Sequence, residues 1–574
     1  MQIQNSPCSW QPPGPRQRRR SYANTTDGTN GSPCSNQPHQ ATEISQGAGS
    51  AIPHVDLPED VLQHIHSLMP MRDAARAACV SRRFLGFWSC YPNLVFSQES
   101  LAARKQPLLW SNEHRGQYVI RTTKQVLGNH SGIGVKTLEL KLSSCNKDDI
   151  SSSLLDAWLQ AFVKPGISEL VVLLPECDAP DHQYNFPYSL LYDETGSSLN
   201  SIQSLCLASC GFHPIKGPRM LGCSRSLTKV CLQKVGVTGN ELGIFLSICI
   251  ALERLNLSNC SMITSLKIPC VLQNLRVLRL RLCSALQTVE SDAPNLSTIR
   301  YEGCCPLLKF SLGDSLETKG LKMHATGMED MIQYTGSNLP SIAPNLETLV
   351  LSTVDEKLKA PVMNDKFKHL KHLVISLGKW GRFCAGYDFF SLACFLDACI
   401  ALETFILRIE DGFIWYKRYL VVGKPDENSL QSMEEIPELR HGGLGNLRKA
   451  TITGFCSAKS LVKLTCHILE RASSLQCLLL DTSPGYDRKG SSTDRCWPMC
   501  LEALRDAERA LSNVREYVEP KVPAGVELKV LGPCSRCHAM DAKAMEEAES
   551  RIPRGCFQYQ EDGSLALVFV QPRS

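Results

Sequence analysis

The sequence predicts an α/β fold in which a block of three short helices precedes a solenoid of short parallel strands with helical returns. Two patterns predict it: apolar residues at helical spacing between Leu57 and Trp88, and a strand-like apolar motif that recurs from Val135 to Leu480. A third observation, the polar composition of residues 1–50, predicts a disordered N-terminal tail. The chain has 574 residues, 43% hydrophobic and 21% charged, which is ordinary for a folded protein.

The helical block begins at Leu57-Pro58-Glu59-Asp60, because proline fits the first helical position and carboxylates stabilise the positive end of a helix dipole. Pro70 should end this first helix, Asp73 is the expected N-cap of the second, and Ser81 begins a third. The first helix carries one predicted apolar stripe, formed by Val61, Leu62, Ile65, Leu68 and Met69. About forty residues cannot bury a comfortable core alone, so this block should dock on another surface, either as a cap of the strand array or on a partner protein.

The strand array is predicted by the motif apolar-x-x-apolar-x-apolar. Its first apolar residues are Val135, Ile167, Ile202, Leu227, Leu252, Leu275, Leu296, Leu346, Leu370, Leu402, Leu447 and Leu475. The interval of roughly 21–25 residues through the middle is the period of leucine-rich repeats. One repeat cannot bury its apolar face, so neighbouring repeats stack and share a core.

We expect the strands of this array to line a concave side. Helical returns such as Gly239–Ile250 and Phe389–Ile400 should cover the convex side. The long interval after Leu296 predicts one further, degenerate strand within Leu316–Met323.

Cysteine is abundant, with 27 residues, but the count is odd and no apolar secretion signal precedes the repeats. Reduced thiols in the nucleus or cytoplasm are therefore the expectation. Cys210, Cys260, Cys283 and Cys304 fall in the Asn/Cys position of the repeat consensus, which predicts a structural role.

Other patterns give little support for chemistry. Cys534 to His538 matches the haem-attachment pattern, and Cys496, Cys500, Cys534 and Cys537 could supply four zinc ligands, but we favour neither and expect no metal or cofactor. No hydrolase, P-loop, metalloprotease or kinase motif set is present, so no enzyme acting alone is predicted. A net charge of +4 and apolar runs too short to span a bilayer favour neither nucleic acid nor membrane as a partner. The arginines between Arg16 and Arg20 fit a polar tail better than a transit or nuclear signal.

Residues 53–96 resemble an F-box in its plant form. The resemblance is carried by Leu57-Pro58-Glu59-Asp60, Ile65, Leu68-Met69-Pro70, Asp73-Ala74, Val80-Ser81-Arg82-Arg83-Phe84 and Trp88. It implies binding to a Skp-type adaptor and, through it, to a cullin. The family's contact positions correspond here to Leu57, Pro58, Ile65, Leu68, Val80, Phe84 and Trp88, where Phe84 replaces the more usual tryptophan.

The array resembles the repeat region of plant F-box proteins with leucine-rich repeats, through Ala293-Pro294-Asn295-Leu296 and Tyr301-Glu302-Gly303. Residues 367–409 and 444–480 resemble the FBD-like carboxy-terminal region of that group. The expected organisation is a linker or cap at 97–134, repeats at 135–484 and a C-terminal cap at 485–574. That cap should contain a helix around Leu501–Val514, a strand at Val526–Val530 and a hairpin at Gln558–Val570.

These observations predict a non-catalytic subunit of a cullin-type (SCF) ubiquitin ligase that recognises a protein substrate. The alternative is a leucine-rich repeat scaffold that is not coupled to ubiquitin transfer. Substrate contacts are expected at exposed strand positions, namely Arg254, Asn256, Arg276, Arg279 and Arg300, whose charges suit an acidic or phosphorylated partner. The same arginines could equally be solvated surface charges.

Overall fold

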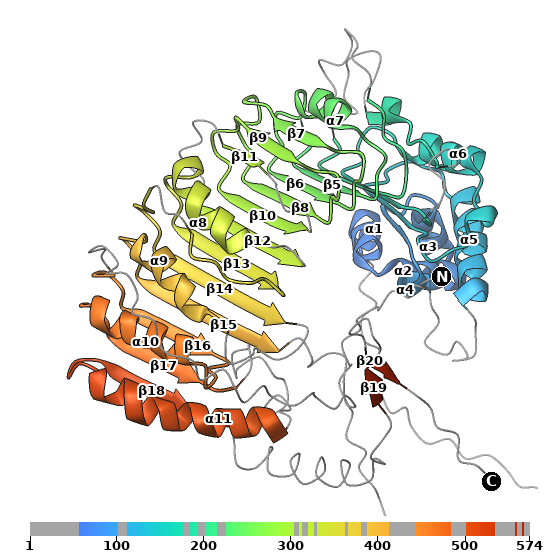
Figure 1. Ribbon diagram of the computed structural model, residues 1–574. Coiled ribbons are helices and arrows are strands. Elements are labelled where there is room, and N and C mark those ends of the chain that lie inside the picture. Colours follow the sequence, from blue (N-terminus) through green and yellow to red (C-terminus); the bar gives the residue numbers. More distant parts are fainter. Residues whose placement is uncertain are drawn as a thin grey trace, which may run out of the picture. The chain divides into compact units, whose positions relative to one another are not determined.

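The computed structural model describes a discontinuous set of segments. They are residues 57–101, 112–176, 183–191, 201–214, 226–303, 309–312, 319–326, 330–361, 365–379, 387–411, 444–483, 501–533, 557–559 and 565–567. Two compact units divide the chain after Pro58, and all helices and strands below belong to the unit from Glu59 onward (Figure 1).

The largest element is a single sheet, in which fifteen strands of the described residues pair in parallel, almost entirely in chain order. Its strands are β1 Asn93–Phe96, β2 Thr137–Lys141, β3 Glu169–Leu173, β4 Ser204–Ala208, β5 Lys229–Gln233, β6 Arg254–Ser258, β8 Val277–Arg281, β10 Thr298–Gly303, β12 Gly320–Thr326, β13 Thr348–Val354, β14 His372–Lys379, β15 Thr404–Asp411, β16 Lys449–Thr453, β17 Cys477–Asp481 and β18 Glu527–Leu531. Every repeat predicted from the apolar motif contains its strand. The degenerate strand is confirmed as β12, although it extends to Thr326, beyond the predicted end.

Three repeats use a strand in place of a helical return. These strands form a separate parallel sheet: β7 Ser265–Ile268, β9 Thr288–Ser291 and β11 Lys309–Ser311. In β7 the buried Leu266 and Ile268 alternate with the exposed Ser265 and Lys267. This two-residue period favours a strand over a helix in a return of this length.

Helices make up the N-terminal block and most other returns. They are α1 Glu59–Leu68, α2 Met71–Val80, α3 Arg82–Trp88, α4 Gln98–Leu101, α5 Asn112–Gly128, α6 Ser152–Phe162, α7 Gly239–Leu246, α8 Met331–Ile342, α9 Leu392–Asp397, α10 Lys459–Arg471 and α11 Leu501–Asn513. Both predicted returns are confirmed. Thr238 and Glu241 start α7 with a capping box, and a 3-10 turn, Phe389–Ser391, leads into α9. Figure 1 shows α8, α9 and α10 following one another along one side of the sheet.

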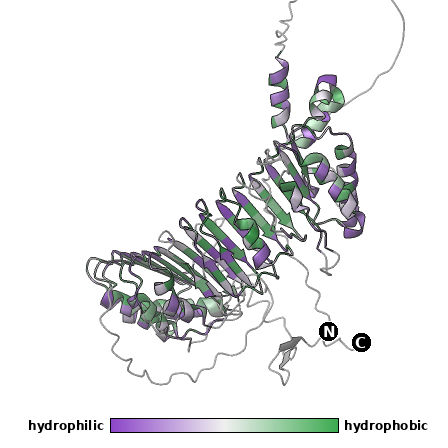
Figure 2. Cartoon of the chain, turned by 90° about the horizontal axis from the view of Figure 1, so that it is seen from above, coloured by the Kyte–Doolittle hydropathy of each residue, from purple (hydrophilic) through white to green (hydrophobic). Residues whose placement is uncertain are grey.

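Burial alternates along the strands and defines one continuous core. In β8, Leu278 and Leu280 are buried, whereas Arg279 and Arg281 are exposed. Figure 2 shows this as hydrophobic and hydrophilic residues interleaved along the strands. Because side chains of a strand point to opposite faces in turn, one face of the sheet packs on the returns and the other remains available for contacts.

The repeat cysteines have the predicted structural setting. Cys210, Cys260 and Cys283 are buried, while Cys304 lies outside the described residues. The residue before each has a left-handed backbone, with φ of 56° at Ser209 and 54° at Asn259. In this conformation the backbone N–H of Asn259 donates to Arg281 O of the next repeat at 2.7 Å. The turn therefore directs a small side chain into the core and joins adjacent repeats.

The helical block is joined to the sheet without a separate linker, because β1 lies within the F-box-like segment and pairs with β2. The Tyr91 hydroxyl donates to Met69 O at 2.6 Å, and Asn93 Nδ2 donates to Ser67 O at 3.1 Å. The sequence patterns did not predict this strand. The predicted N-cap role of Asp73 is wrong: α2 begins at Met71, so Asp73 lies inside its first turn and accepts from Arg76 at 3.2 Å.

Replacing Tyr91 by phenylalanine should test this junction. Loss of one buried side-chain hydrogen bond is expected to lower the free energy of unfolding of this end by about 1 kcal/mol, with the ring still packed. Hydrogen exchange at the amides of β1 and β2 measures the change. Exchange that stays at the wild-type rate there would show that the bond to Met69 O contributes nothing.

The C-terminal elements agree with the predicted helix, strand and hairpin. β18 corresponds to the Val526–Val530 strand and extends the long sheet by pairing with β17. β19 Phe557–Tyr559 and β20 Leu565–Leu567 form the antiparallel hairpin, although its Asp562-Gly563 turn lies outside the described residues. No helix in the described segments is long and apolar enough to cross a membrane.

Candidate functional site

The first helix carries two apolar stripes rather than the single one predicted. Leu62 and Met69 lie partly buried beside His66, which is fully buried. Val61, Ile65 and Leu68 occupy the other stripe and are exposed, Leu68 to 72%. Because positions i, i+4 and i+7 share one helix face, the inner stripe holds the block together, and no element of the described segments covers the outer one.

Further exposed apolar side chains lie where α2 gives way to α3. Val80 is 86% exposed and Leu85 is 56% exposed. We use the name apolar helical surface for Val61, Ile65, Leu68, Val80 and Leu85. Large apolar side chains exposed to this extent within one small block are typical of a protein-binding surface. Leu57 and Pro58, which stand immediately before α1 in the sequence, are also exposed.

The two aromatic residues predicted to contact an adaptor are half-buried. The Phe84 ring stacks on His66 with centroids 5.4 Å apart, and the Trp88 ring stacks on Tyr91 at 5.4 Å. His66 Nε2 also lies 3.1 Å from Ala74 O, which joins α1 to α2. The sequence analysis did not identify His66 as a buried residue. Only its helical spacing from Leu62 and Met69 indicated that it would face inward. Phe84 and Trp88 therefore support the block from inside while presenting part of their surface outside.

Four of the sequence-predicted substrate residues lie on the exposed face of the strands. Asn256, Arg279 and Arg300 are consecutive register partners on β6, β8 and β10, and Arg254 is exposed at the start of β6. Arg276 differs, because it directly precedes β8 and its carbonyl accepts from Thr298 N at 2.9 Å. The structure adds Lys322 of β12, the register partner of Arg300, which the uncertain bounds of the degenerate strand had concealed.

No ion pair within the described residues neutralises this row of cations. Arg279, Arg300 and Lys322 are exposed and form no ion pair with another described residue. The neighbouring Arg281, in contrast, donates from Nε to both carboxylate oxygens of Glu302 at 3.1 and 3.0 Å. Among the residues that the structure describes, the sheet thus presents three unpaired positive charges side by side.

Beyond Lys322 the same row becomes apolar. Its register partner is Val350 on β13, followed by Val374 on β14 and Ile406 on β15, all half-buried. We call Arg279, Arg300, Lys322, Val350, Val374 and Ile406 the central row. Its two halves differ in character, so it can bind a partner that offers negative charge at one end and apolar side chains at the other.

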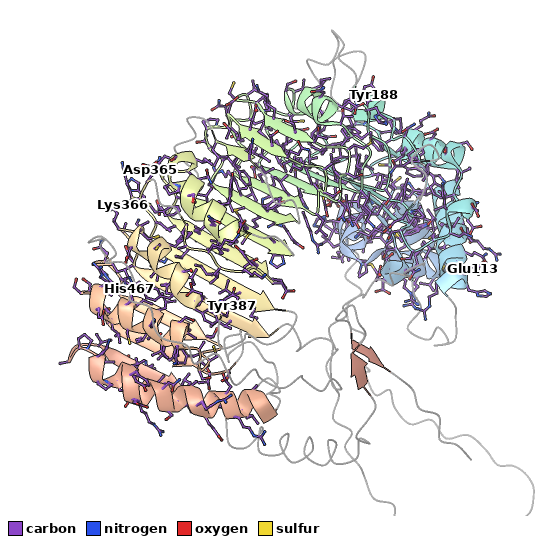
Figure 3. All side chains as sticks on the ribbon, viewed as in Figure 1. Glu113, Tyr188, Asp365, Lys366, Tyr387 and His467 are labelled. Carbon is purple, nitrogen blue, oxygen red and sulfur yellow. The ribbon has the colours of Figure 1, made fainter. Side chains whose placement is uncertain are left out.

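Catalytic and metal chemistry receive no support from the described geometry. A buried His–Asp pair exists, with His467 Nε2 2.9 Å from Asp397 Oδ1. Figure 3 labels His467. The Phe390 ring lies edge-on to His467, and the pair joins α9 to α10. The described segments contain no group of three or more His, Cys, Asp or Glu residues arranged to hold a metal. The four cysteines considered for zinc, like Cys534 to His538, lie outside those segments.

Comparisons with known proteins match both halves of this arrangement. Residues 55–91 match the model of the F-box domain, and residues 126–535 match the At1g61320/AtMIF1 LRR domain. An Arabidopsis thaliana protein, the F-box/FBD/LRR-repeat protein At1g13570, is 25% identical over 218 residues. That alignment covers 37% of this chain and 46% of the relative, so the chain spans about half the length of the curated protein it matches.

Proposed function

Because this chain belongs to the At1g61320/AtMIF1 LRR-domain family and carries an F-box domain, we propose that it is a substrate-recognition subunit of a cullin-type (SCF) ubiquitin ligase. F-box domains bind Skp-type adaptors, and leucine-rich repeats bind proteins. The observation that carries the proposal is the apolar helical surface, which is exposed on a block continuous with the repeat sheet. The plant F-box/LRR group consists typically of non-catalytic adaptors.

The proposed mechanism is proximity. The apolar helical surface, together with Leu57 and Pro58, docks the adaptor, and the strand face of the repeats holds the substrate. A bound substrate then has a high effective concentration near the conjugating enzyme carried by the rest of the complex, which raises the rate of transfer without side-chain chemistry in this chain. Action in the nucleus or cytoplasm is consistent with the free thiols of the described residues.

The test is co-purification of the full chain with a Skp-type adaptor. Wild-type protein should form a stable complex, and the Leu57→Ala/Pro58→Ala variant should lose it while keeping the circular dichroism spectrum of the repeats. A folded wild-type chain that does not bind the adaptor would refute the ligase assignment and leave the scaffold as the better description.

We further propose that the central row recognises the substrate. Parallel strands lie about 4.8 Å apart, so its six side chains extend over roughly 24 Å across the sheet. An extended segment of about seven residues has this length. The charges favour a segment with acidic or phosphorylated residues against Arg279, Arg300 and Lys322, and apolar residues against Val350, Val374 and Ile406.

Charge reversal tests this assignment. Arg279→Glu/Arg300→Glu should weaken binding of a fluorescent peptide with an acidic half and an apolar half by at least about tenfold, since each lost charged contact contributes about 1.5 kcal/mol or more. Fluorescence anisotropy measures the affinity, and wild-type binding should fall as salt is added.

The matched control is Lys267→Glu/Lys309→Glu, which reverses two charges on the smaller sheet formed by β7, β9 and β11. It should bind as wild type. Equal weakening by both variants would indicate a general effect of net charge and would remove the central row from the proposal.

A further inference from the structure

Two cysteines face each other on the open side of the sheet. Cys206 of β4 and Cys231 of β5 are direct register partners. Both are half-buried, while the flanking Leu205 and Leu207, and likewise their counterparts on β5, are buried in the core. The two thiols therefore lie on the same face as Asn256 and the central row, with Cys231 on the strand next to Asn256 and Cys206 one strand further.

The geometry of the pair suits a covalent bond. Adjacent strands are about 4.8 Å apart, which falls within the Cα separation of about 4.4–6.8 Å found for disulfides. The two thiols are also close enough to shift each other's pKa. Rotation about the Cα–Cβ bonds can therefore bring the two sulfur atoms toward each other across the strand pair.

The surroundings assign different roles to the two sulfurs. The pKa of Cys231 is lowered to about 7, because the interaction with Cys206 and the positive charge of Lys229 together outweigh the opposing effect of burial. The same interaction, followed by burial, raises the pKa of Cys206. Lys229, two residues earlier on the same face of β5, favours negative charge at Cys231, which makes Cys231 the better nucleophile and Cys206 the thiol that resolves an oxidised sulfur.

We propose that Cys206 and Cys231 form a peroxide-sensitive dithiol that closes reversibly to a disulfide on the strand face. The Cys231 thiolate attacks one oxygen of hydrogen peroxide, the O–O bond breaks, and sulfenic acid forms as the other oxygen leaves as water after taking up a proton. The Cys206 sulfur then attacks Cys231, forming the S–S bond and releasing a second water that carries the Cys206 proton. The two sulfurs supply the two electrons that reduce the peroxide, and a small thiol or dithiol reductant restores the pair.

A second cysteine pair provides an internal control. Cys260 and Cys283 are also close enough to shift each other's pKa, but they occupy the core position of their repeats and are 0% and 3% exposed. Dissolved peroxide should reach Cys231 and not these buried sulfurs. The pKa shifts of the two pairs are similar, so a difference in their reactivity with peroxide would reflect how exposed each pair is.

The experiment treats the reduced full-length protein with a small excess of hydrogen peroxide, removes the oxidant with catalase, and alkylates remaining thiols before trypsin digestion. Cys231 is the sole cysteine of the peptide Val230–Lys234, which makes its fate readable by mass spectrometry. The expected result is a peptide cross-linked to the one that contains Cys206, with loss of two hydrogen atoms and full return after dithiothreitol. The Cys260 and Cys283 peptides should remain alkylated.

Variants distinguish the roles of the two sulfurs. Cys206→Ser should abolish the cross-link and leave a Cys231 sulfenic acid that dimedone traps, whereas Cys231→Ser should give neither product. Cys283→Ser should keep the Cys206–Cys231 cross-link. A wild-type protein in which Cys231 stays fully alkylatable, or yields only the dimedone adduct, would overturn the proposal, as would cross-linking through Cys210 that persists in Cys206→Ser.

Discussion

Replacing Leu68 and Val80 together by glutamate should abolish binding of the Skp-type adaptor and leave the fold unchanged. Both side chains point into solvent, at 72% and 86% exposure, so their loss removes almost no internal packing. Burying such a side chain in an interface contributes about 1.5 kcal/mol or more, and two desolvated carboxylates add a further penalty. A loss of at least 3 kcal/mol is therefore expected, which is roughly a 100-fold or greater fall in affinity.

The measurement is isothermal titration of purified adaptor into the full chain, with thermal unfolding recorded for each variant. Ile133→Glu is the matched control, because Ile133 is 66% exposed in the loop between α5 and β2, outside the apolar helical surface. The control should bind like wild type. If the double variant binds normally, or if the control loses binding as well, the apolar helical surface is not the docking site.

The second large effect concerns the alternation within β8. Leu278→Asp should destabilise the central repeats by about 4 kcal/mol or more, because the new carboxylate would be buried without a cationic partner. Leu278 is fully buried, as are its register partners Leu255 and Ile299. Val277→Asp, only one residue earlier, should change stability by no more than about 0.5 kcal/mol, since Val277 is half-buried on the open face opposite Arg254.

Circular dichroism melting and limited proteolysis should distinguish the two variants. Repeats are stabilised mainly by their neighbours, so Leu278→Asp is expected to open cleavage sites around β8 before the ends of the array unfold. Greater destabilisation by Val277→Asp than by Leu278→Asp would mean that this strand is shifted by one residue, because such a shift exchanges the buried and open faces.

The apolar motif predicted the repeat strands because its spacing directly reflects which residues must point into the shared core. At the two ends of the sheet, the sequence did not show which strands would pair. Asn93–Phe96 followed an apparently self-contained helical block, and nothing local showed that it would hydrogen-bond to β2. Likewise, Val526–Val530 could be recognised as a strand, but its place beside β17 depends on tertiary contacts. In three repeats, short returns with a two-residue period became strands instead of helices.

The candidate sites were less predictable than the fold, because exposure depends on which of two similar faces meets a neighbour. On α1 the outer Val61, Ile65 and Leu68 and the inner Leu62, His66 and Met69 have the same spacing, and only packing against α3 distinguishes them. Arg276 and Arg279 were equivalent in sequence, yet only Arg279 lies on the strand. Lys322 became recognisable as part of the row once its register with Arg300 was known.

Because β1 pairs with β2, the number of strands also sets the distance between the helical block and any later strand of the sheet. From β1 to β8 there are six inter-strand steps, which correspond to about 29 Å along the sheet. Among the described strands the pairing from β1 to β8 is continuous, so we expect the distance between these two ends to follow the number of repeats. If the proposed function holds, adding or deleting one repeat before β8 should move a bound substrate by about 5 Å relative to the adaptor-binding end.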